Sequence, residues 1–188
     1  MPLYLIRQNH MLKLIGAVLL VYTAAFAQPK DTDGWGKVKW GMTVEQVKAA
    51  YGAEAENSNV VPGPNFIFID RLTVPNVKIG DLEMKASLQT PKGSDQIKQV
   101  SITLKAPLES PSFIRSGAFD RLKGLVIEKY GAPANEDRTT ERSSIIKTLL
   151  WSLPSTTITL IWSEGTRYEL GYVELRYKAV DKKALDVL

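Results

Sequence analysis

The chain has 188 residues, with 24 lysines and arginines, 20 aspartates and glutamates, one histidine and no cysteine. The histidine is His10, so beyond the N-terminal segment the chain has no histidine base, cysteine nucleophile, Ser-His-Asp triad or His/Cys zinc site. Disulfides are excluded as well, and the charges are interleaved rather than gathered into the basic stripe typical of nucleic-acid binding. Carboxylate catalysis and oxygen-ligated metals stay open in principle. No motif singles out residues for them, so we predict no catalytic residues, no metal site, no cofactor and no nucleic-acid partner.

Residues 1–27 have the order of a secretory signal peptide. Arg7 and Lys13 precede an apolar run that starts at Leu14, and Ala25-Phe26-Ala27 places small residues where a signal peptidase reads them. The run is shorter than the roughly 20 apolar residues that a membrane span needs. We therefore expect cleavage after Ala27 and a periplasmic or secreted protein without a membrane span.

Cleavage would remove Arg7 and Lys13, so the working protein would be less basic than its formal charge of +4 indicates. Two alternatives stay open for this segment: an uncleaved N-terminal anchor, or a buried helix. The start could also be Met11 rather than Met1, since Met11 begins a more compact signal.

The first helix is predicted after a flexible segment at residues 28–39. Thr43 is a good N-cap, and Gln46 three residues later completes the pattern of a capping box. Val47 and Tyr51 continue an apolar stripe along one helix face. Gly52 is the residue type that commonly ends a helix, because glycine adopts left-handed backbone angles without steric cost.

Apolar and polar residues then alternate in several short segments, which is the period of a half-buried strand. Clean alternation indicates an antiparallel sheet with one dry and one solvated face. Residues 91–95 and 164–166 carry turn-forming residues between strands, and residues 60–65 read as a loop. The predicted strands are Phe66–Asp70, Leu82–Gln89, Lys98–Lys105, Ser144–Trp151, Thr156–Ser163 and Tyr172–Lys178.

A second helix is predicted between the two groups of strands. Phe119, Leu122, Val126 and Tyr130 form its apolar stripe, and Gly131 ends it. The phrase Val-x-x-x-Tyr-Gly-Ala occurs in both helices, which indicates an internal repeat.

These elements predict an α+β fold made of two tandem repeats, each a helix packed on a three- or four-stranded antiparallel β-sheet. The first repeat spans residues 40–108 and the second spans residues 109–180, followed by a C-terminal tail at 181–188. Whether the two halves share one sheet, and the oligomeric state, stay open at this stage.

The motifs resemble those of exported bacterial proteins of unknown function with a Trp-Gly-Met-[Ser/Thr] start and a Tyr-Gly helix end. Here they are Trp40-Gly41-Met42-Thr43 and Tyr51-Gly52, with Tyr130-Gly131 in the second half. The tandem plan is also similar to the secreted β-lactamase inhibitory proteins and to the small lipoprotein of the outer-membrane barrel assembly machinery. Because both of these act by binding other proteins, the resemblance implies a binding role, but it carries over no functional residues.

The solvated sheet face is the candidate binding surface. Its alternative interpretation is a plain solvated sheet. A second hypothesis places an acidic site at Glu54, Glu56, Glu136 and Asp137, which follow the two helices at matching positions. The residues predicted to bind on the sheet face are Lys85, Gln99, Ser101, Tyr172, Glu174 and Arg176.

The sequence thus predicts an exported, non-enzymatic binding protein of the bacterial cell envelope, whose partner would be another envelope protein or a peptide. Two alternatives stay open. One is a carboxylate-based hydrolase or lyase, which needs two facing acidic side chains in a cleft. The other is a carrier of a small apolar ligand, which needs an apolar pocket between helix and sheet.

Overall fold

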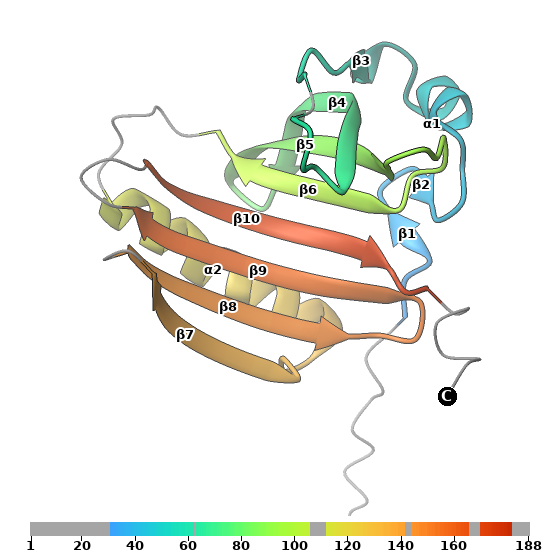
Figure 1. Cartoon of the computed structure of the whole chain (residues 1–188). Helices are drawn as coiled ribbons and strands as arrows, with labels where there is room; N and C mark the ends of the chain where they lie inside the picture. Colours follow the sequence, from blue (N-terminus) through green and yellow to red (C-terminus); the bar gives the residue numbers. More distant parts are fainter. Residues whose placement is uncertain (1–30, 62, 106–111, 142–143, 166–169, 182–188) are drawn as a thin grey trace, which may run out of the picture.

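The computed structural model describes residues 31–61, 63–105, 112–141, 144–165 and 170–181 (Figure 1). The predicted signal peptide, residues 28–30, and residues 182–188 of the predicted tail lie outside the described residues. No helix in the described ranges is both long and apolar enough to cross a membrane.

Eight antiparallel strands form one continuous sheet in the order β3-β4-β5-β6-β10-β9-β8-β7 (Figure 1). The two halves of the chain meet where β10 pairs with β6, in a register that sets Arg176 opposite Ser101. This pairing answers the question that the sequence left open. The strands are β3 (Glu56–Asn57), β4 (Phe68–Ile79), β5 (Leu82–Pro91), β6 (Gln99–Leu104), β7 (Asn135–Glu141), β8 (Ser144–Ser152), β9 (Thr156–Gly165) and β10 (Leu170–Ala179).

The N-terminal part of the described chain is more ordered than the sequence predicted. β1 (Gly34–Trp35) and β2 (Val38–Lys39) form a small antiparallel hairpin in the segment that was expected to be flexible. The helix α1 (Val44–Tyr51) follows, and both hydrogen bonds of the predicted capping box between Thr43 and Gln46 are present. A short 3-10 helix, η1 (Gly52–Glu54), then leads to β3.

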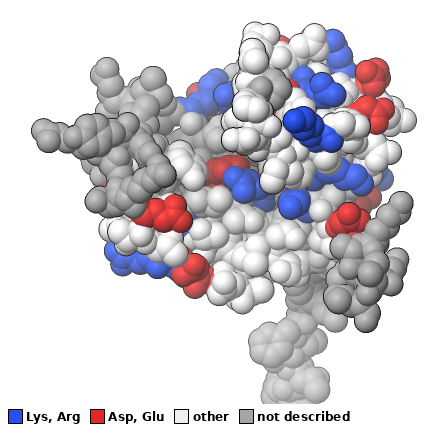
Figure 2. All heavy atoms as spheres, viewed as in Figure 1, with Lys and Arg blue, Asp and Glu red and all other residues white. Residues whose placement is uncertain are grey.

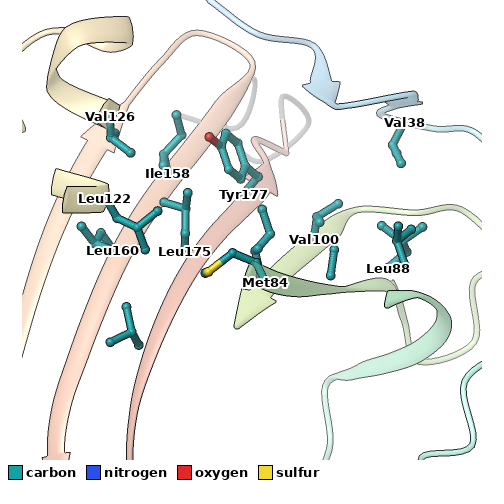
Figure 3. Close-up of a cluster of buried hydrophobic side chains, with 14 of the residues drawn as sticks. Val38, Met84, Leu88, Val100, Leu122, Val126, Ile158, Leu160, Leu175 and Tyr177 are labelled. Carbon is teal, nitrogen blue, oxygen red and sulfur yellow. The ribbon is translucent and has the colours of Figure 1, made fainter. Parts of the chain in front are cut away.

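The second helix, α2 (Ser112–Tyr130), lies against β9 and β10 on one face of the sheet (Figure 1). Its predicted stripe is confirmed, because Phe119, Leu122, Val126 and Tyr130 are all buried. Gly131 follows with a φ of 82°, a left-handed conformation that suits glycine. Figure 3 shows Leu122 and Val126 beside the apolar side chains of β9 and β10.

One hydrophobic cluster joins the two halves (Figure 3). It extends from Leu122 on α2, through Leu175 and Met84, to Leu88 on β5 and Val38 on β2 of the N-terminal hairpin. These side chains are at most 2% exposed. The apolar positions of β5, β6, β9 and β10 therefore face one side, as the alternation predicted.

The predicted α+β fold of two tandem helix-on-sheet repeats is wrong. The protein is mostly β, and its strands form one eight-stranded sheet and the small β1–β2 hairpin. The two α-helices of the described residues are also unequal, since α1 has 8 residues and α2 has 19. Only α2 lies along the sheet, whereas α1 packs beside β4 and η1.

Tyr51 and Tyr130, the paired residues of the supposed repeat, have different surroundings. The Tyr51 hydroxyl accepts a hydrogen bond from the backbone N–H of Lys37 at 3.2 Å. Tyr130 instead packs edge-on against Tyr177, with ring centroids 6.4 Å apart. The shared phrase therefore encodes a helix that ends on a buried tyrosine, and it does not extend to a repeated tertiary unit.

A candidate binding groove on the open sheet face

The sheet face opposite α2 carries no helix within the described part of the chain, and Figure 1 shows α2 behind β8, β9 and β10. Figure 2 views this open face. Basic side chains cross the middle of the surface, and the region over β8 and β9 is mostly uncharged. This is the face that the sequence predicted to be solvated and to bind a partner.

A groove with a volume of about 890 Å³ lies on the open face, over β5, β6, β9 and β10. Three of the predicted binding residues line it, namely Gln99, Glu174 and Arg176. Ser101 does not line the groove, but its hydroxyl donates a hydrogen bond to Glu174, which does. The full lining is Asn65, Phe66, Ile67, Phe68, Gln89, Gln99, Thr157, Thr159, Glu174, Arg176, Lys178, Ala179, Val180 and Asp181.

The other two predicted residues, Lys85 and Tyr172, do not line the groove. Lys85 lies on β5 opposite Thr103 of β6, which in turn lies opposite Glu174, so Lys85 is two strands away from β10. Tyr172 lies two residues before Glu174 on β10, and 43% of its surface is exposed. The structure therefore brings four of the six predicted residues together and leaves these two at the margin.

Glu174 is the centre of a hydrogen-bonded cluster in the groove. The Nε and Nη2 atoms of Arg176 donate to its two carboxylate oxygens at 2.9 and 2.7 Å, and the Ser101 hydroxyl donates to Oε1 at 2.7 Å. The Glu174 side chain is 11% exposed and that of Arg176 is 35% exposed. Because the pair is bidentate and charge-assisted, it holds both side chains in a defined geometry.

A second line of hydrogen bonds crosses three strands beside this cluster. Gln99 Nε2 donates to Gln89 Oε1 at 2.5 Å, and Gln89 Nε2 donates to Asp70 Oδ1 at 2.6 Å. These residues face one another in the register of β4, β5 and β6. The floor of the groove is therefore built from polar side chains that are already bonded to one another.

An apolar wall forms one side of the groove. Phe66 and Ile67, in the loop before β4, line the groove while being 59% and 76% exposed. The loop is held in place, because Phe66 N–H donates to the carbonyl of Gly63 at 3.3 Å and Lys92 N–H donates to that of Ile67 at 2.9 Å. Exposed aromatic and aliphatic side chains gathered in one place commonly mark a contact surface.

The environment of Tyr172 links it to the groove. Burial raises the pKa of the Tyr172 hydroxyl above its ordinary value, and the nearby carboxylate of Glu174 raises it further, while Arg176 acts in the opposite direction. Tyr172 therefore stays a neutral hydroxyl at physiological pH, so its phenol can both donate and accept hydrogen bonds.

The predicted acidic site is wrong. Glu56 lies in β3 at one edge of the sheet, whereas Glu136 and Asp137 lie in β7 at the opposite edge. Glu54 instead pairs with Lys37 at 2.9 Å. The carboxylates that follow the two helices therefore do not form one site. Over the described ranges, no group of three or more acidic side chains could hold a metal ion.

Sequence reasoning missed the apolar wall and the glutamine line. Residues 60–65 were predicted to be a loop and Phe66–Asp70 a strand, but β4 begins only at Phe68, so Phe66 and Ile67 belong to the loop together with Val60 and Val61. The density of these apolar residues beside Pro and Gly was a usable signal for an exposed apolar loop. The pairing of Gln89 with Gln99 depends on the strand register, which the alternation of single strands does not give.

In comparisons with known proteins, no family model, no curated protein and no solved structure matches the chain.

Proposed function

We propose that this protein is a non-enzymatic binding protein of the bacterial cell envelope that holds a segment of a partner protein in the open-face groove. The observation that carries the proposal is the combination of a bonded polar floor with an exposed apolar wall. Protein-binding sites commonly join aromatic anchors to polar groups that fix the orientation of the partner.

The polar floor supports binding because its side chains are already ordered. Glu174 has three hydrogen-bond donors around it, and Gln89 and Gln99 bond to each other. A partner would therefore meet side chains whose conformational entropy has already been lost. Such pre-organisation lowers the free-energy cost of association.

The apolar wall favours the proposal of a macromolecular partner, because it exposes apolar surface that a partner could cover. Of the large apolar side chains that are exposed in the described residues, four belong to one loop, namely Val60, Val61, Phe66 and Ile67. Phe66 and Ile67 line the groove, so a partner in it would remove their apolar surface from water, which stabilises a complex by about 25 cal/mol per Å² before the costs of association.

The proposed location in the envelope is supported by the composition of residues 1–27, with two basic residues before an apolar run and small residues at Ala25 and Ala27.

Binding is better supported than the two alternatives. A carboxylate hydrolase needs a free acid and base, but Glu174 in the groove is held by Arg176 and Ser101. A carrier of a small apolar ligand needs an enclosed apolar pocket, whereas this groove has a floor of amide, hydroxyl and charged groups and lies outside the interface of α2 and the sheet.

The test is affinity capture from the cell envelope with the protein as bait. Changing Phe66 and Ile67 together to Ser, or Tyr172 and Arg176 together to Ala, is expected to remove the captured partner. Leu125→Ser is the matched control, because Leu125 is an exposed apolar residue of α2 on the other face of the sheet. Retention of every captured partner by both groove variants would contradict the proposal.

A further inference from the structure

The groove presents positively charged hydrogen-bond donors, although its lining holds two basic and two acidic residues. Arg176 uses Nε and Nη2 for Glu174, and its Nη1 atom makes no hydrogen bond within the described part of the chain. The Arg176 side chain is 35% exposed against 11% for Glu174. The carboxylate therefore lies below the guanidinium, and a partner meets the cation first.

Lys178 supplies a second cation at the same place. It is exposed on β10, it lines the groove, and its ammonium lies 5.5 Å from the centre of the Phe68 ring. It forms no ion pair with any described residue. A cation over an aromatic ring keeps its remaining hydrogen-bond donors available to a ligand.

The acidic groups at the groove are already engaged. Glu174 accepts three hydrogen bonds, and Asp70 accepts one from Gln89. Asp181, the other acidic residue of the lining, also has an interaction partner. The Lys178 ammonium and the Nη1 atom of Arg176 thus remain as cationic donors without a hydrogen-bond partner among the described residues, and the charge complement of such donors is an anion.

The apolar wall lies next to these cations. The Phe68 ring, at the start of β4, lies beside the Lys178 ammonium, and Phe66 and Ile67 continue the wall in the loop that precedes β4. A ligand that fills the groove must therefore carry an acidic group and a large apolar group side by side. The groove has a volume of about 890 Å³ and is lined by residues of several neighbouring strands, which gives room for several residues of a polypeptide.

We propose that the partner segment is an extended stretch of polypeptide in which an internal aspartate or glutamate lies next to a large apolar residue. Its carboxylate pairs with Lys178 and with the outward side of Arg176. Its apolar side chain packs against Phe66 and Ile67. This inference rests on the proposed function and names the chemistry of the partner at the same groove.

The test measures binding of the purified protein to an array of octapeptides. The two central positions combine Asp, Glu, Asn or Gln with Leu, Phe or Ser, and both peptide ends are blocked. We expect acidic–apolar peptides to bind about tenfold more tightly than their amide counterparts, as a charge-assisted hydrogen bond would give. Equal affinity for acids and amides would overturn the inference.

Lys178→Gln is the first variant, and Lys129→Gln is its matched control, because the Lys129 ammonium also lies over a ring, that of Tyr130, but on α2. Lys178→Gln should remove most of the preference for acids, and the control should keep it. Because Arg176→Gln alone leaves Glu174 without its partner, the second variant changes Glu174 and Arg176 together to Gln. An unchanged acid preference in both groove variants would overturn the inference.

The remaining outcomes separate this inference from the proposed function. One outcome is that acidic and amide peptides bind with equal affinity and that Phe66→Ser weakens the binding of both equally. In that case the groove binds polypeptides, and only the proposed preference for an acidic residue is wrong. A further set of peptides has a free C-terminal carboxylate. If these peptides bind tightly and blocked acidic peptides do not, the partner's carboxylate is a chain terminus, and the proposal of an internal acidic residue is overturned. If no peptide binds but phosphatidylglycerol vesicles do, in a manner lost in Ile67→Asp, a lipid surface replaces the polypeptide and both proposals fail.

Discussion

Arg176 lies two residues after Glu174 on the same strand and donates two hydrogen bonds to its carboxylate, at 2.9 and 2.7 Å. Successive even positions of a strand share one face, so this pair lies wholly on the open face of the sheet. Ser101 of β6 joins the pair from the other half of the chain. The cluster thus spans the β6–β10 pairing that unites the sheet, and it also forms part of the groove.

The first prediction concerns this pair. Arg176→Gln should lower the free energy of unfolding by roughly 1–3 kcal/mol, because it leaves the mostly buried Glu174 carboxylate without its charged partner. The loss should be smaller than for a fully buried ion pair, because Arg176 is partly exposed. Urea unfolding of each single variant and of Glu174→Gln/Arg176→Gln would measure it. The double variant should recover part of the loss, and strictly additive losses would contradict a direct coupling.

The second prediction concerns the core beneath α2. Leu122 is fully buried in that helix, so Leu122→Ala should cost about 2–5 kcal/mol of stability through lost burial and a cavity. Leu125→Ala, three residues on, is the control, since Leu125 is 37% exposed and should cost much less. Thermal and urea unfolding would compare them. Equal losses would mean that α2 does not present the face shown in Figure 3.

The third prediction compares two glycines, one at a position that disfavours a side chain and one at a position that accepts it. Gly36 has a φ of 57°, and a Cβ there would lie 2.6 Å from the Tyr51 hydroxyl, so Gly36→Ala should destabilise the protein. Gly124 is exposed in α2 with no atom within 4 Å of a Cβ, so Gly124→Ala should stabilise it by roughly 0.5–1 kcal/mol. Unfolding midpoints would show the two shifts. A gain in stability from Gly36→Ala would exclude the backbone conformation described for the β1–β2 hairpin.

The fourth prediction concerns alkaline pH. Burial strongly raises the pKa of the Tyr177 hydroxyl, and its neighbour Tyr130 raises it further. The tyrosine pKa in the unfolded chain is about 10. Because the pKa of Tyr177 is higher in the folded protein, its contribution to stability is complete below that pH and is lost as the pH increases further. Stability should therefore fall above about pH 10, and less steeply in Tyr177→Phe. Absorbance titration of tyrosine with parallel circular dichroism would follow it, and ionisation of every tyrosine before unfolding would contradict it.

Several local features were predictable from the sequence, although β1, β2 and β3 were not predicted and the strand predicted at Phe66–Asp70 is β4, which spans Phe68–Ile79. The strand from Thr156 was predicted to end at Ser163 and ends at Gly165, and the capping residues Thr43 and Gln46 form the expected bonds. Both depend on nearby residues, so the 2-residue period and the cap chemistry suffice. β7 was missed because its residues Asn135–Glu141 are all exposed and show no alternation of apolar and polar types.

The global arrangement was not predictable in the same way. The pairing of Ser101 with Arg176 joins strands far apart in the sequence, and no local pattern selects it over two separate sheets. The repeated Tyr-Gly phrase favoured a duplicated unit, yet the surroundings of Tyr51 and Tyr130 are set by different parts of the chain, the N-terminal hairpin and β10. The sheet face with Gln99, Glu174 and Arg176 was predicted because alternation assigns faces. The apolar wall was missed because Phe66 and Ile67 were assigned to a strand, whereas they lie in the loop before β4.

Site-resolved photo-crosslinking in cells tests the central claim, that a partner occupies the groove. The photoreactive residue p-benzoylphenylalanine would replace Thr159, which lines the groove, or Leu125 on α2 as the control. We predict a discrete protein adduct from position 159, lost when Phe66 and Ile67 are changed to Ser, and none from position 125. The absence of any adduct at position 159, or the same adducts at both positions, would contradict the account.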